Sequence, residues 1–217
     1  MKINTIIKIA TLACFVLVGR QEGYSQGTFG NLNFESVIPP LNPDINFSVP
    51  ISNALPRWSG YLNGTPQDRV IYNGFSLSGP SISLVDSLFF QPIQGSYSVY
   101  LKSFSDTGGT SAAIGQTGQI PNSALSLFFI RDPQSGFAVS FGGQPISLVQ
   151  FGTSGNNLIM AGDISQFAGQ TGELLFVGTG LFDAIQFSSQ PIPEPSVLGL
   201  LGLGGLFVGC YRRKCQR

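Results

Sequence analysis

The sequence contains no histidine, and its three cysteines, Cys14, Cys210 and Cys215, all lie near the ends of the chain. Without histidine, the usual general base of hydrolases and the most common transition-metal ligand are missing. Without a cysteine between residues 15 and 209, the central part of the chain has no thiol nucleophile and no disulfide bond. A central domain must therefore be stable through its hydrophobic core.

Charged residues are also scarce, at 10% of the chain against about 25% in an average soluble domain. Residues 26–192 contain four basic and nine acidic residues, which gives this part a net charge of −5. This mildly acidic body has no basic cluster. It argues against nucleic acid as a partner, because phosphate binding needs clustered Lys and Arg side chains.

Residues 1–25 are typical of a secretory signal peptide. Lys2 and Lys8 give a positive start, an apolar run follows over residues 9–18, and small residues precede a cleavage site before Gln26. The alternative is a permanent N-terminal anchor, but the run is short against the ~20 residues that a membrane span needs.

The C terminus combines a Pro-Glu-Pro triplet, an apolar Gly/Leu-rich segment and a basic cluster. The triplet and the cluster consist of Pro193, Glu194, Pro195, Arg212, Arg213 and Lys214. The apolar segment, about 196–211, would reach roughly 24 Å as a helix, close to the ~30 Å of a hydrocarbon core. We therefore expect a transmembrane helix here, with a basic cytoplasmic end and the body outside.

This three-part tail, over 191–217, resembles the PEP-CTERM sorting domain. The resemblance implies recognition by an exosortase, a membrane-embedded sorting enzyme, and contact with the lipid bilayer through the tail. It also implies a Gram-negative bacterium that makes extracellular polysaccharide. The mature protein would be anchored at the cell envelope, or released to the surface or matrix after tail processing.

Between the two ends, short strand signals alternate with turn signals. Apolar side chains alternate at 96–102 and 137–141. The other strand candidates are Ala124–Ile130, Val70–Tyr72, Ser81–Val85, Ile146–Phe151, Leu174–Val177 and Leu181–Phe187. Asn63-Gly64 and Gly142-Gly143 are among the turn signals, and one short helix is expected over 163–168. The pattern predicts an all-β, antiparallel β-sandwich ectodomain of the jelly-roll kind over 26–190.

Several short segments in the body follow one another in a suggestive order. They are 31–35, 55–58, 95–101, 114–117, 120–121, 169–171, 174–176 and 182–187. Together they loosely resemble exported jelly-roll domains of the galactose-binding-like type. In such domains the closing strand often has two adjacent acids, whereas here Ala184 follows Asp183.

Three residues are candidates for ligand binding in the body. Trp58, the only tryptophan, and Tyr61 lie in a Gly-containing stretch and could form a stacking platform for a sugar ring. The alternative, which we favour, is a core tryptophan. Asp183 could bind calcium together with backbone carbonyls. The favoured alternative is that it pairs with a local backbone group.

No catalytic motif or cofactor motif is present, so the body is not expected to be an enzyme or to need a cofactor. The leading hypothesis is an envelope or extracellular-matrix protein with a structural or adhesive body. The second is a module that binds extracellular polysaccharide. The third is an extracellular hydrolase with a carboxylate pair, which would require two of the nine scattered acids to converge in a cleft.

Overall fold

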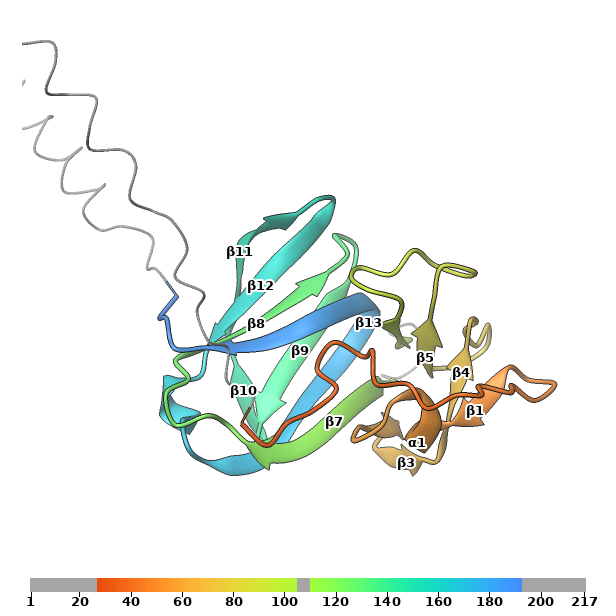
Figure 1. Cartoon of the computed structure of the whole chain (residues 1–217), viewed down its shortest axis with the longest axis horizontal. Coiled ribbons are helices and arrows are strands. Elements are labelled where there is room, and N and C mark those ends of the chain that lie inside the picture. Colours follow the sequence, from red (N-terminus) through yellow and green to blue (C-terminus); the bar gives the residue numbers. More distant parts are fainter. Residues whose placement is uncertain (1–26, 105–109, 193–217) are drawn as a thin grey trace, which may run out of the picture.

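The computed structural model describes residues 27–104 and 110–192, which form an all-β fold (Figure 1). In chain order, its elements are β1 (Ser48–Pro50), α1 (Ile51–Ala54), β2 (Ser59–Leu62), β3 (Thr65–Gln67), β4 (Arg69–Tyr72), β5 (Ser81–Val85), β6 (Ser98–Lys102), β7 (Ala112–Gln119), β8 (Ser126–Arg131), β9 (Gly136–Phe141), β10 (Gln144–Ile146), β11 (Leu148–Ser154), β12 (Asn157–Asp163), the 3-10 helix Ser165–Phe167 and β13 (Thr171–Ser188). The strands belong to one hydrogen-bonded system.

The long strand β13 connects two groups of strands, because its two halves have different neighbours. The half before Gly180 pairs with β7 and β9, whereas the half from Gly180 onward pairs with β6 and β8. One group has the order β10-β9-β13-β7-β2-β3, and the other has the order β1-β4-β5-β6-β13-β8-β12-β11. Gly180, at φ +119°, lies where β13 passes from one group to the other.

The two groups face each other across a core rich in phenylalanine. Phe176, from the first half of β13, packs edge-on against Phe129 of β8, with ring centroids 5.3 Å apart. Phe176 also stacks on Phe182, from the second half, at 5.1 Å. All three side chains are fully buried. The arrangement is a sandwich in which alternating residues of facing strands fill the interior.

Several strands lie where the apolar patterns predicted them. β5 has the predicted bounds, and Val99 and Leu101 of β6 and Val139 and Phe141 of β9 point into the core. The turns at Asn63-Gly64 and Gly142-Gly143 have positive φ at both residues, as tight hairpin turns between β2 and β3 and between β9 and β10 require.

Three expectations need correction. The sandwich is not purely antiparallel, because β4 and β5 pair in parallel. The parallel pairing is short and involves only Ile71 with Ser83 and Tyr72 with Leu84. The segments predicted separately at 174–177 and 181–187 form the single strand β13, since Gly180 continues the ladder. The predicted helix at 163–168 is a one-turn 3-10 helix.

The predicted signal peptide, residues 1–25, and the predicted transmembrane helix, about 196–211, lie outside the described residues. Within the described ranges, neither helix is long and apolar enough to cross a membrane.

Candidate functional site

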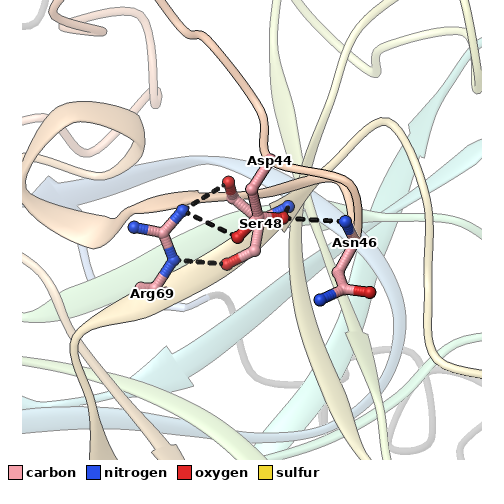
Figure 2. Close-up of polar contacts among 4 residues, drawn as sticks. All are labelled: Asp44, Asn46, Ser48 and Arg69. Carbon is pink, nitrogen blue, oxygen red and sulfur yellow. Dashed lines mark hydrogen bonds and ion pairs between the residues drawn. The ribbon is translucent and has the colours of Figure 1, made fainter.

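A loop before β1 presents apolar side chains at one end of the molecule, and a polar network fixes its shape (Figure 2). The Asp44 Oδ1 atom accepts hydrogen bonds from the backbone N–H groups of Asn46 (2.8 Å) and Ser48 (2.9 Å). Arg69 of β4 donates from Nη2 to Asp44 Oδ2 (3.1 Å) and to the Ser48 carbonyl (2.7 Å), and from Nε to Ser48 Oγ (2.7 Å).

The network favours the charged form of Asp44. Its pKa is lowered first by the backbone N–H groups of Ser48 and Asn46, while the positive charge of Arg69 contributes less. The loop is therefore closed by an Asx-type turn, and Arg69 ties that turn to the neighbouring strand.

Ile45 and Phe47 alternate with Asp44, Asn46 and Ser48 in this loop and are exposed to solvent, with 95% and 59% of their surface accessible. Phe47 has φ +58°, an uncommon conformation for a bulky residue. Both line an open hollow of about 660 Å³ together with Leu77 and Phe89, which are also exposed. We call these four residues the apolar end.

The segments that present Leu77 and Phe89 are also held in place. Asp86 accepts hydrogen bonds from the Tyr72 hydroxyl (2.5 Å) and from Asn73 Nδ2 (2.9 Å). The Asp86 N–H donates in turn to Asn73 Oδ1 (2.9 Å). Burial raises the pKa of Tyr72, and its bond to Asp86 raises it further, so the hydroxyl remains a donor. The loops that present the four side chains of the apolar end are thus held in place by hydrogen bonds at their bases.

A second concave region, the aromatic groove, has a volume of about 380 Å³. It is lined by Phe90, Tyr100, Asp132, Gln134, Thr179, Gly180 and Leu181. The rings of Phe90 and Tyr100 stack with centroids 5.4 Å apart and an angle of 28° between their planes. Burial, and then the charge of Asp132, raise the pKa of the Tyr100 hydroxyl.

Asp132 shapes this groove as well as lining it. Its carboxylate accepts hydrogen bonds from the Ser135 hydroxyl and from the backbone N–H groups of Gln134 (2.8 Å) and Leu181 (2.8 Å). The connection between β8 and β9 is thereby held against β13. Stacked rings beside a carboxylate and an amide side chain can contact an apolar ring face and donate to or accept from hydroxyl groups.

Trp58 and Tyr61 do not form a stacking platform. Trp58 is only 4% exposed, lies 5.6 Å from the Phe34 ring and donates from Nε1 to the Asn31 carbonyl (2.9 Å). Tyr61 is half-buried, and its hydroxyl donates to Glu173 Oε1 (2.8 Å), which raises its pKa. The platform hypothesis fails because Trp58 fills the space between the two layers.

Asp183 is fully buried and bound by local groups. Its Oδ2 accepts from Ser98 Oγ (2.7 Å) and the Gln94 N–H (3.2 Å), and its Oδ1 accepts from the Ala184 N–H (2.6 Å). Burial raises its pKa to about 7, although these hydrogen bonds act in the opposite direction. The described part of the chain contains no group of three His, Cys, Asp or Glu residues that could hold a metal ion.

Sequence reasoning missed the role of Glu35, which lies near Asp183. Glu35 Oε1 accepts from the backbone N–H groups of Ser96 (2.8 Å) and Tyr97 (3.0 Å). Together the two acids hold the connection that leads into β6. The adjacent Gly95 has φ +61°, and an added Cβ would lie 2.3 Å from Glu35 Oε1. In the sequence, the only local sign of this contact was the pair Gly95-Ser96 shortly before β6.

Comparison with known protein families identifies the tail. Residues 191–214 match the PEP-CTERM protein-sorting motif. No curated protein sequence and no solved structure matches the chain, so the looser resemblance of the body to galactose-binding-like domains finds no support there. The motif residues from Pro193 onward lie outside the described residues.

The motif indicates exosortase-dependent sorting of an exported protein, with the tail recognised by an exosortase in the membrane. The protein is processed at the membrane and associated with the cell envelope.

Proposed function

We propose that the body is a non-catalytic adhesive module of the envelope or extracellular matrix, and that it attaches through the apolar end. The observation behind this proposal is that Ile45 and Phe47 are exposed on a loop fixed by Asp44 and Arg69. Contiguous exposed apolar surface is characteristic of interaction sites. A loop already ordered before binding loses less conformational entropy on contact, which favours its use as a docking element.

The roles of the acids support a non-catalytic body. Glu35, Asp44, Asp86, Asp132 and Asp183 each accept hydrogen bonds that organise a turn or connection. A glycosidase needs two carboxyl groups free to act on one bond. Glu35 and Asp183 are close enough to influence each other, but both bind backbone N–H groups of the same connection.

Adhesion is tested by removing the apolar side chains at the loop tip. The double variant Ile45→Ser/Phe47→Ser, made in the full chain, is expected to be washed from the cell surface several-fold more readily than wild type. Its stability should hardly change, because both side chains are exposed in the folded state. The measurement is the protein recovered from the surface and from the medium after matched washes.

The matched control is Ile45→Val/Phe47→Leu, which keeps the same positions apolar and should be retained like wild type. If the serine variant is retained equally well while both variants reach the envelope, the apolar end is not the adhesive surface.

Carbohydrate binding is the second candidate function, and the aromatic groove favours it. Tyr100 and Phe90 offer ring surface, and within the described residues the Tyr100 hydroxyl makes no hydrogen bond. Gln134 adds an exposed amide at the rim. The volume of about 380 Å³ suits one or two sugar rings. An extracellular polysaccharide is the ligand class that matches an exported, envelope-associated protein.

The carbohydrate hypothesis predicts that Tyr100→Phe weakens binding of a polysaccharide fragment about fivefold. That figure corresponds to one lost hydrogen bond of about 1 kcal/mol. The measurement is titration of the full chain in detergent with oligosaccharides selected on a glycan array. Tyr97→Phe, which lies outside the groove, is the matched control and should bind like wild type. Equal binding by both variants, or no glycan bound at all, would remove this candidate.

A further inference from the structure

The edges of the two layers are protected unequally. Within the described residues, four strands pair on one side only: β1, β3, β10 and β11. Three of them are only three residues long and contain a proline, namely Pro50 in β1, Pro66 in β3 and Pro145 in β10. Short strands and prolines are the usual means by which a sheet edge is blocked against further pairing.

The edge strand β11 has neither of these protections. It is seven residues long, with the sequence Leu-Val-Gln-Phe-Gly-Thr-Ser, and it contains no proline and no charged residue. Val149 and Phe151 are about half exposed, at 48% and 49%. A bulge between Gln150 and Gly152 is its only irregularity. A long, uncharged edge with exposed apolar side chains can accept another strand.

An apolar groove continues from this edge over the neighbouring strands. Phe151 packs edge-on against Phe128 of β8, with ring centroids 5.1 Å apart. Both rings line a hollow of about 320 Å³ together with Ile130, Ile159 and Ala184. A partner strand beside β11 would therefore extend an existing apolar surface, rather than being held by backbone hydrogen bonds alone.

We propose that β11 pairs with β11 of a second copy of this chain, antiparallel and around a twofold axis near Gln150. In this register, Val149 of each copy lies opposite Phe151 of the other, giving two apolar cross-strand pairs. Because β11 has no charged residue, pairing two copies of it brings no like charges together, although the body as a whole is acidic. All copies have the same sorting tail and gather at the same envelope, which raises the local concentration of this partner.

In Figure 1, β11 lies on the side of the molecule away from β1, the strand that follows the apolar loop. Pairing through β11 would leave the apolar end accessible in both copies. The inference is independent of the adhesive function, because the two surfaces share no residue.

Cysteine cross-linking in the intact envelope tests the pairing. The full chain is expressed with Cys14, Cys210 and Cys215 replaced by alanine, and a single cysteine is introduced by Gln150→Cys. Opposed residues in an antiparallel pair have Cα atoms about 4.5–5.5 Å apart, within the ~4.4–6.8 Å that a disulfide spans. Mild oxidation should give a disulfide-linked dimer on a non-reducing gel. Thr65→Cys, on the proline-containing edge β3, is the matched control and should stay monomeric.

A second variant separates pairing from misfolding. Val149→Lys, added to Gln150→Cys, places a charge at the edge and is expected to reduce the dimer at least tenfold, with an unchanged melting temperature because the position is exposed. Monomer at both cysteine positions would overturn the proposal. So would cross-linking at Thr65 equal to that at Gln150, or a dimer that Val149→Lys leaves unchanged.

Discussion

Trp58→Ala is expected to lower the free energy of unfolding by about 3–5 kcal/mol, the range for removing a buried large aromatic side chain. Trp58 lies between Phe34 and Phe176, with ring centroids 5.6 and 6.3 Å away. Its loss leaves a cavity between the layers and deprives the Asn31 carbonyl of its indole donor. Urea unfolding, followed by circular dichroism, measures the change.

Tyr61→Phe is the matched control, because it removes only a hydroxyl from a half-buried neighbour in sequence. It should cost about 1 kcal/mol, the value of its hydrogen bond to Glu173. A Trp58→Ala protein as stable as Tyr61→Phe would show that Trp58 is not part of the core.

The stability of the body is expected to fall as the pH rises from about 4 to about 7, because of Asp183. Its pKa in the folded state is about 7, against an ordinary value of 3.8. Between these two pH values, the folded state keeps a proton on Asp183 that the unfolded state has released. Above about pH 7, the folded state must instead bury a charged carboxylate. The loss is at most about 1.4 kcal/mol per pH unit, and on the order of 4 kcal/mol in total.

Three other acids have shifts in the opposite direction, which act at lower pH. Asp44, Asp86 and Asp163 have lowered pKa values, so their stabilising contributions are lost only as the pH falls below about 4. The measurement is a series of urea unfolding curves between pH 4 and 8. Asp183→Asn cannot ionise and should flatten the profile. Parallel profiles for the variant and the wild type would assign the pH dependence to another group.

Much of the local structure could be predicted from sequence. Val99 and Leu101 alternate with polar neighbours and face the core, and Gly142-Gly143 forms the turn that two consecutive positive φ angles require. Asp163 was expected to cap a short helix. It is instead the last residue of β12, and its carboxylate accepts the Ser165 N–H at 2.9 Å where the 3-10 helix begins. These features depend on residues a few positions apart, so a local pattern is sufficient to predict them.

The candidate surfaces depend on contacts that no local pattern encodes. Arg69 reaches Asp44 across 25 residues, and Gln94 reaches Asp183 across 89. Trp58 and Tyr61 are close in sequence, but Trp58, just before β2, is buried in the core, whereas Tyr61, within β2, is partly exposed. Which aromatic rings would be available to a ligand was therefore decided by tertiary packing, which placed Phe90, in the connection after β5, beside Tyr100 of β6.

The sequence by itself determined that this is an exported protein, since the sorting motif is read as a linear segment and its recognition needs no fold of the body. It also determined the all-β class, because residue periodicity and turn residues act over short distances. Only the tertiary structure decided that β13 joins both layers, which acids hold connections in place, and which sheet edge is long and free of proline. Those properties arise from the pairing of strands far apart in the chain, where many registers satisfy the local pattern and packing of the shared core selects one.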